Sequence, residues 1–92
     1  MALYLISYDI DEKNNDYTKL YALLEDWKAA KVLFSEWLVI SDEGAKTLAD
    51  AIAAVIEAGD RILVQEVTQD AAWLNLRMND DSFRKWLEYA RV

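Results

Sequence analysis

The chain has 92 residues, 54% hydrophobic and 29% charged, which is enough for one core but too little for two domains. It has neither cysteine nor histidine, which excludes disulfides, thiolate chemistry and the commonest ligands of zinc. The net charge of −7 opposes binding to the phosphate backbone of nucleic acids.

The absence of histidine and cysteine limits cofactors and metals. We expect no cofactor, and any metal would be a hard cation such as Mg²⁺ or Mn²⁺ held by carboxylates. The apolar runs are of strand length and are broken by charges, so we expect no transmembrane helix. The N-terminus lacks the features of a secretory signal peptide, and we therefore expect a cytoplasmic protein.

The first element in chain order is predicted to be a buried strand over residues 3–10. It ends at Tyr8-Asp9, just before a polar turn. Both of its faces are largely apolar, as in a central strand that is covered on two sides. One face carries Leu3, Leu5 and Ser7, and the other carries Tyr4, Ile6 and Tyr8.

The next two elements are predicted from a change in periodicity. Apolar residues at helical spacing indicate a helix from Tyr17 to about Ala29, after a turn that ends at Asp16. Residues 31–41 are rich in β-formers but are interrupted by Ser35-Glu36. They predict a bent strand, a bulged strand, or two short strands in a tight hairpin.

The second half of the chain repeats the alternation of helix and strand. A helix is expected after the cap at residues 41–43, with Gly59 ending it, and a strand follows over residues 60–67. Residues 68–78 are less regular. Asn79 or Asp80 is then expected to cap a last short helix that carries Phe83 and Trp86.

This order predicts a single α+β domain over residues 1–92. The pattern β-α-β(β)-α-β with a C-terminal helical extension matches the ferredoxin-like sandwich, in which both helices cover one face of the sheet. A three-stranded parallel α/β unit is the competing interpretation. The second apolar face then needs a cover, either the C-terminal segment with Trp73 and Trp86 or a second copy. We favour the second copy, and hence a homodimer.

The segment Leu5-Ile-Ser-Tyr-Asp-Ile10 resembles the first strand of the CRISPR-associated protein 2 family. The predicted elements up to about residue 67 follow in the matching order. The resemblance implies a ferredoxin-like homodimer in which Asp9 faces its mate across the two-fold axis. In some members that pair is proposed to hold a divalent cation for endonuclease activity, and others are non-catalytic scaffolds in the spacer-integration complex.

Asp9 is the candidate catalytic and metal-ligating residue. As a ligand of Mg²⁺ or Mn²⁺ it would orient a water for phosphodiester attack, together with its symmetry mate. As a structural residue it would accept hydrogen bonds from backbone amides of the following turn. We favour the structural interpretation, because two carboxylates alone make a weak metal site. The neighbouring residues Asp11, Glu12 and Asp16 are interpreted as a solvated turn that caps the helix.

Four basic residues near the C-terminus form the only basic concentration in the chain. One interpretation is that this concentration complements the C-terminal end of the last helix. If nucleic acid binds this protein, we expect it there. The residues are Arg77, Arg84, Lys85 and Arg91.

These observations predict a small homodimeric binding or scaffold module, similar to the CRISPR-associated protein 2 family and not an efficient enzyme. We expect an unidentified protein partner, with nucleic acid disfavoured by the net charge and no membrane. One alternative is a divalent-metal-dependent endoribonuclease or DNase that uses paired Asp9 residues. The other is an acidic mimic of nucleic acid that inhibits another protein.

Overall fold

The computed structural model describes residues 1–92 and shows one antiparallel sheet of four strands with three helices. This architecture confirms the α+β class. Because every strand pair is antiparallel, the alternative of a parallel α/β unit is wrong. The elements in order are β1 (Ala2–Asp9), α1 (Thr18–Asp26), β2 (Ala30–Leu33), β3 (Glu36–Ser41), α2 (Ala45–Ala53), β4 (Arg61–Val67) and α3 (Asp80–Leu87).

The strands lie in the order β2-β3-β1-β4, so β1 and β3 are central and β2 and β4 form the two edges. The central position of β1 explains why its sequence is apolar on both faces. Ile6 of β1 lies opposite Trp37 of β3 on one side and Val64 of β4 on the other. The register places Asp9, the last residue of β1, opposite Arg61, the first residue of β4.

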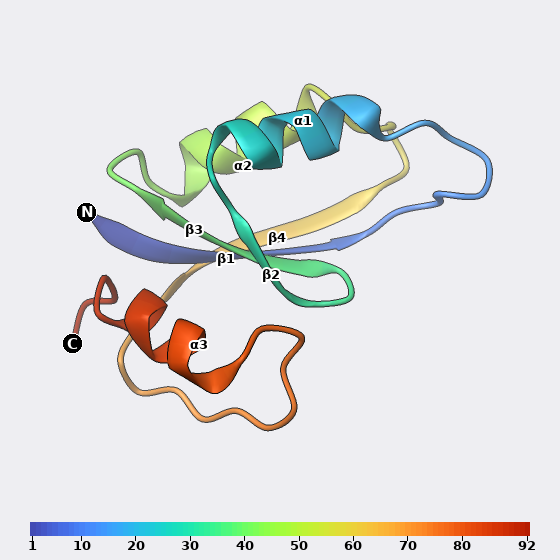
Figure 1. The fold of residues 1–92 in the computed structure, drawn as a ribbon. Helices are drawn as coiled ribbons and strands as arrows, with labels where there is room; N and C mark the ends of the chain where they lie inside the picture. The colour runs from blue at the N-terminus through green and yellow to red at the C-terminus, as the bar shows by residue number, and fades with distance from the viewer.

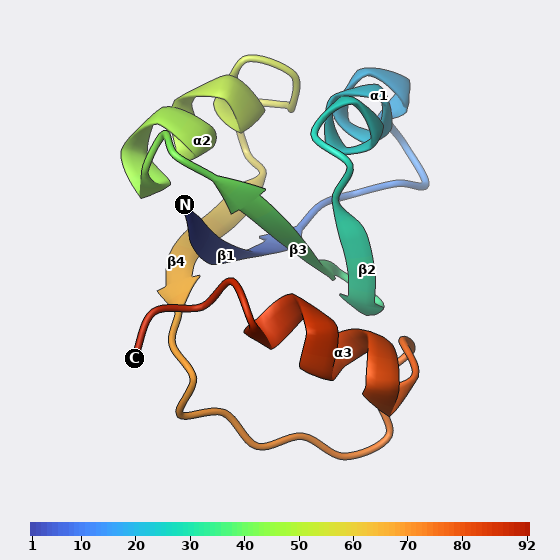
Figure 2. The same ribbon diagram turned by 60° about the vertical axis from the view of Figure 1, so that its left-hand side comes forward.

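Two layers of helix enclose the sheet (Figures 1 and 2). Helices α1 and α2 lie on one face, and α3 lies on the other with the loop that precedes it. Strand β1 contributes side chains to the cores on both faces of the sheet, because successive side chains of a strand point to opposite faces. The core beneath α1 and α2 includes Tyr4, Ile6, Tyr8, Leu20, Leu24 and Ile52. The core beneath α3 is built from Leu3, Val32, Leu38, Phe83 and Ala90.

The face that we expected a second copy to cover is covered by the chain itself. Phe83 of α3 is buried against Leu3 and Leu38 of the sheet. Its ring also packs on Trp73, with the ring centroids 4.6 Å apart. The apolar character of this face is thus explained by the C-terminal segment, and the face does not require a homodimer.

The β-rich segment in the middle of the chain is a tight hairpin. Strands β2 and β3 are joined by Phe34 and Ser35, and their register shifts between Lys31 and Leu33. Two of the three expected forms therefore occur together, a hairpin and a bulged strand. The bulge bends β2 at the edge of the sheet.

The predicted end of α2 is wrong, whereas the predicted cap of α3 is correct. Helix α2 ends at Ala53, so Gly59 does not terminate it, and the glycine with a left-handed backbone is Gly44 at its start, with φ of 97°. For α3 the prediction is confirmed, because Asn79 Oδ1 accepts a hydrogen bond from the backbone amide of Ser82 at 2.8 Å. None of the three helices is long and apolar enough to cross a membrane.

Candidate functional site

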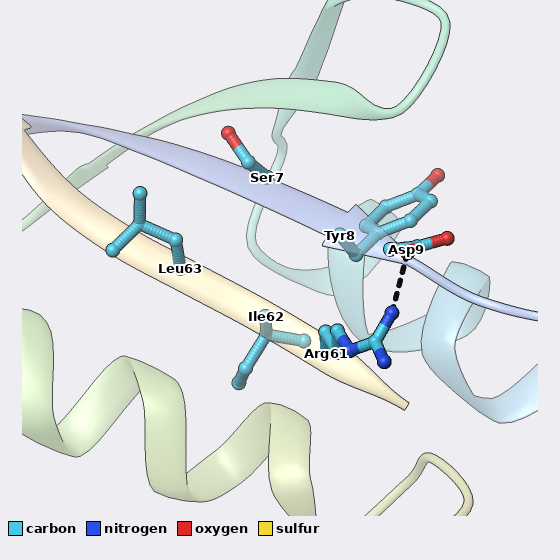
Figure 3. A pocket seen from close by; sticks show the side chains of 6 residues that line it. All are labelled: Ser7, Tyr8, Asp9, Arg61, Ile62 and Leu63. Atoms are coloured by element: carbon cyan, nitrogen blue, oxygen red, sulfur yellow. Dashed lines mark hydrogen bonds and ion pairs between the residues drawn. The ribbon is translucent and has the colours of Figure 1, made fainter. Parts of the chain in front are cut away.

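Asp9 lies at the surface, with its carboxylate bound by a cation from the neighbouring strand. Its side chain is 74% exposed, and Arg61 Nη1 donates to Oδ2 over 3.3 Å, as Figure 3 shows. No backbone amide donates to this carboxylate. The structural interpretation must therefore be corrected in its detail, because the partner of Asp9 is a guanidinium 52 residues away in sequence and not the following turn.

The ion pair of Asp9 and Arg61 borders an open depression of about 280 Å³ between β1 and β4. On the same face of the sheet, the Ser7 hydroxyl donates to the carboxylate of Glu36, which lies opposite it on β3. Both polar groups of β1 on this face are thus engaged with side chains of adjacent strands. The depression is lined by Ser7, Tyr8, Asp9, Arg61, Ile62 and Leu63 (Figure 3).

The acidic turn after β1 makes contacts within itself and does not gather around Asp9. Asp11 accepts a hydrogen bond from Asn14 Nδ2 at 2.8 Å. Asp16 accepts from the Thr18 hydroxyl and from the Thr18 backbone amide, and these bonds lower the pKa of the Asp16 carboxyl. No group of three or more acidic side chains in the chain is placed to hold a metal ion.

The aromatic residues beside Asp9 form a packed cluster on the opposite face of the sheet. Tyr8 is buried, and its hydroxyl accepts a hydrogen bond from Trp37 Nε1 at 3.0 Å. The ring of Tyr21 lies 6.3 Å from that of Trp37. Burial, followed by the proximity of Glu12 and Tyr8, raises the pKa of Tyr21. Tyr8 is therefore a core residue. Its hydroxyl is bound to Trp37 on the face of the sheet opposite to Asp9.

The basic residues near the C-terminus are distributed along α3. Arg77 precedes this helix and Arg91 follows it, and a helix of eight residues is about 12 Å long. The Arg91 guanidinium binds the Glu66 carboxylate through two hydrogen bonds. This ion pair raises the pKa of the guanidinium and lowers that of the carboxyl. Arg84 lies 3.5 Å from Asp81. Two of the four residues of the expected basic concentration, Arg84 and Arg91, are thus paired with carboxylates of the chain.

One exposed residue was missed by the sequence analysis. Phe34, at the turn of the hairpin, is 65% exposed, with Lys31 Nζ at 5.1 Å and the Arg77 guanidinium at 5.6 Å from the centre of its ring. The backbone amide of Arg77 donates to the carbonyl of Val32 at 2.9 Å, which ties this segment to the hairpin. The sequence did contain a signal for this exposed ring. Leu33 and Phe34 are apolar residues at a turn, where residues are usually polar.

Comparison of the chain with protein-family models, with curated proteins and with solved structures finds no match.

Proposed function

We propose that this protein is a non-catalytic binding or scaffold module of ferredoxin-like architecture, similar to the CRISPR-associated protein 2 family. The strand order β2-β3-β1-β4, with α1 and α2 on one face, supports the ferredoxin-like assignment. The strand that ends in Tyr8-Asp9 supports the family resemblance.

The observation that carries the non-catalytic assignment is the ion pair between Asp9 and Arg61. A metal-dependent nuclease needs a carboxylate whose oxygens are free for Mg²⁺, and the hydrated ion must also reach the substrate phosphate. Here a guanidinium already provides the positive charge beside Asp9. A divalent cation would have to compete with Arg61 without the help of further carboxylates.

A protein partner is favoured by the surface around Phe34. Aromatic and arginine side chains contribute most to the energy of protein interfaces. In this protein the exposed ring of Phe34, at the turn of the hairpin, lies 5.1 Å from Lys31 Nζ and 5.6 Å from the Arg77 guanidinium. The surface fits a partner that offers an apolar pocket with an acidic rim.

Thermal melts with and without Mn²⁺ test the role of Asp9. We expect Mn²⁺ to leave the melting temperature of the wild type unchanged. Asp9→Asn should cost less than about 1 kcal/mol, since exposed ion pairs contribute little. Asp50→Asn is the matched control, because Asp50 forms an exposed pair with Lys46 within α2.

A different result would reverse the assignment. If Mn²⁺ stabilises the wild type and the Asp50→Asn variant but not Asp9→Asn, Asp9 is a metal ligand. The endonuclease alternative then replaces the scaffold proposal.

A further inference from the structure

The two edges of the sheet differ in how well they are protected. Edge strands offer unpaired backbone groups to other chains, and proteins usually block them with bulges, lysines, proline or a covering segment. The β2 edge has four residues, a register shift and Lys31. It is also covered by Arg77, whose amide donates to Val32.

The β4 edge lacks these protections over residues 61–65. All seven residues of Arg61–Val67 pair with β1 in an unbroken register, and β4 contains neither lysine nor proline. No backbone group outside the sheet makes a hydrogen bond to these residues. The C-terminal tail meets only the end of the strand, where Arg91 binds Glu66 and the backbone pairs at Thr68 and Gln69, and it leaves residues 61–65 open.

The charges of β4 are at its ends and are neutralised within the chain. Arg61 is paired with Asp9, and Glu66 with Arg91. Between them lies an uncharged stretch in which Leu63 is 56% exposed. Charge therefore does not protect this edge against pairing.

We propose that β4 pairs antiparallel with β4 of a second copy, around a two-fold axis at Leu63, to give one sheet that continues through both copies. In this register Leu63 faces Leu63 of the second copy, and Ile62 faces its Val64. Arg61 faces the uncharged Gln65, and the pairing ends there, because the next pair would place Asp60 opposite Glu66. The exposed leucine is then buried by its own mate.

The sequence of the strand explains why a second copy is the occupant. The apolar residues Ile62 and Val64 flank Leu63 symmetrically, so the strand is complementary to itself, and cross-strand apolar pairs stabilise a sheet. An axis at Val64 would instead place Ile62 opposite Glu66. The expected homodimer thus forms through the sheet edge, not through the face that α3 covers. It does not depend on the scaffold proposal.

Light scattering at micromolar concentration tests the dimer. The wild type should show twice the chain mass of 10.6 kDa. Leu63→Lys should be monomeric, because it places a charge at the two-fold axis. Leu74→Lys is the matched control and should remain dimeric, because Leu74 is 82% exposed in the loop before α3. A monomeric wild type, or a dimer that persists in Leu63→Lys, would overturn the proposal.

Cysteine crosslinking tests the register and does not require Leu63→Lys to fold. The chain has no native cysteine. In the proposed register, Leu63→Cys brings two Cβ atoms to about 5 Å, so oxidation should give a covalent dimer. Gln65→Cys is the control, because its two copies would lie about 13 Å apart, four residues along the strand. Crosslinking of Gln65→Cys but not of Leu63→Cys would show that the register is wrong.

Discussion

At the scale of single residues, two aspartates at the junction of β1 and β4 have different environments. Asp9 is exposed and has Arg61 as its charged partner. Asp60 accepts the hydroxyl of Tyr17 at 2.7 and 2.8 Å and the backbone amide of Glu57 at 2.8 Å. Asp60 therefore links the start of α1 to the start of β4, and it is the aspartate with the structural role first assigned to Asp9.

Alkaline pH should destabilise the protein through Tyr17 and Tyr21. Burial, followed by the bond to Asp60, raises the pKa of Tyr17, and burial also raises that of Tyr21. The folded state then holds these protons at a pH at which the unfolded chain, with an ordinary tyrosine pKa of about 10, releases them. Stability is present below that pH and is lost as the pH rises through the folded pKa values.

Urea denaturation at neutral pH and at about pH 11 checks this expectation, with the second pH chosen above the ordinary pKa of tyrosine. The free energy of unfolding of the wild type should fall between the two, and Tyr17→Phe should reduce the fall. The exposed Tyr89→Phe is the control and should behave as the wild type. An equal loss in Tyr17→Phe and wild type would contradict the role given to Tyr17.

At the scale of elements, α3 completes the second layer of the fold. Its sheet-facing side carries Phe83, while Asp80 and Asp81 lie in its first turn and Arg84 and Lys85 in its last. This distribution matches the helix dipole, with negative charge at the N-terminus and positive charge at the C-terminus. The charged residues at its two ends therefore stabilise the helix itself, while Phe83 packs it against the sheet.

Removal of the Phe83 ring should weaken the whole protein. Phe83 is 8% exposed and packs on Trp73, so Phe83→Ala leaves a cavity and should cost about 3–5 kcal/mol in urea denaturation. That is a large part of the stability of a domain of this size. Lys85→Ala, on the exposed side of the same helix, should change stability by less than about 0.5 kcal/mol. Equal effects of the two changes would mean that α3 does not cover the sheet in solution.

At the scale of the whole molecule, the net charge bears on binding to nucleic acid. The net charge is −7, and Arg84 and Arg91 are each paired with a carboxylate. Phosphate contacts require free cations, because affinity for nucleic acid comes largely from the release of counterions. Arg84 and Arg91 are therefore not free to contact a nucleic-acid backbone.

We expect labelled DNA and RNA to show no salt-sensitive binding at ~100 mM salt. Submicromolar binding that weakens steeply with salt would overturn this expectation. Two variants would then locate the site. Loss of binding in Phe34→Ala would assign it to the exposed ring at the hairpin, and loss in Arg84→Ala would assign it to α3.

Local sequence patterns were sufficient to predict the elements and the α+β class. The alternation in β1 and the helical spacing after Tyr17 depend on neighbours along the chain, and so does the cap at Asn79. These features are determined by a few consecutive residues. The sequence by itself also determined that both faces of β1 must be covered, because both are apolar.

What covers each face, and what pairs with each charge, was decided by the tertiary structure. Asp9 and Arg61 are 52 residues apart, and Tyr17 and Asp60 are 43 apart, so no local periodicity connects them. An apolar face signals burial but does not identify the segment that buries it. That choice depends on the path of the chain after β4, which brings Phe83 back under the sheet and leaves Leu63 exposed at its edge.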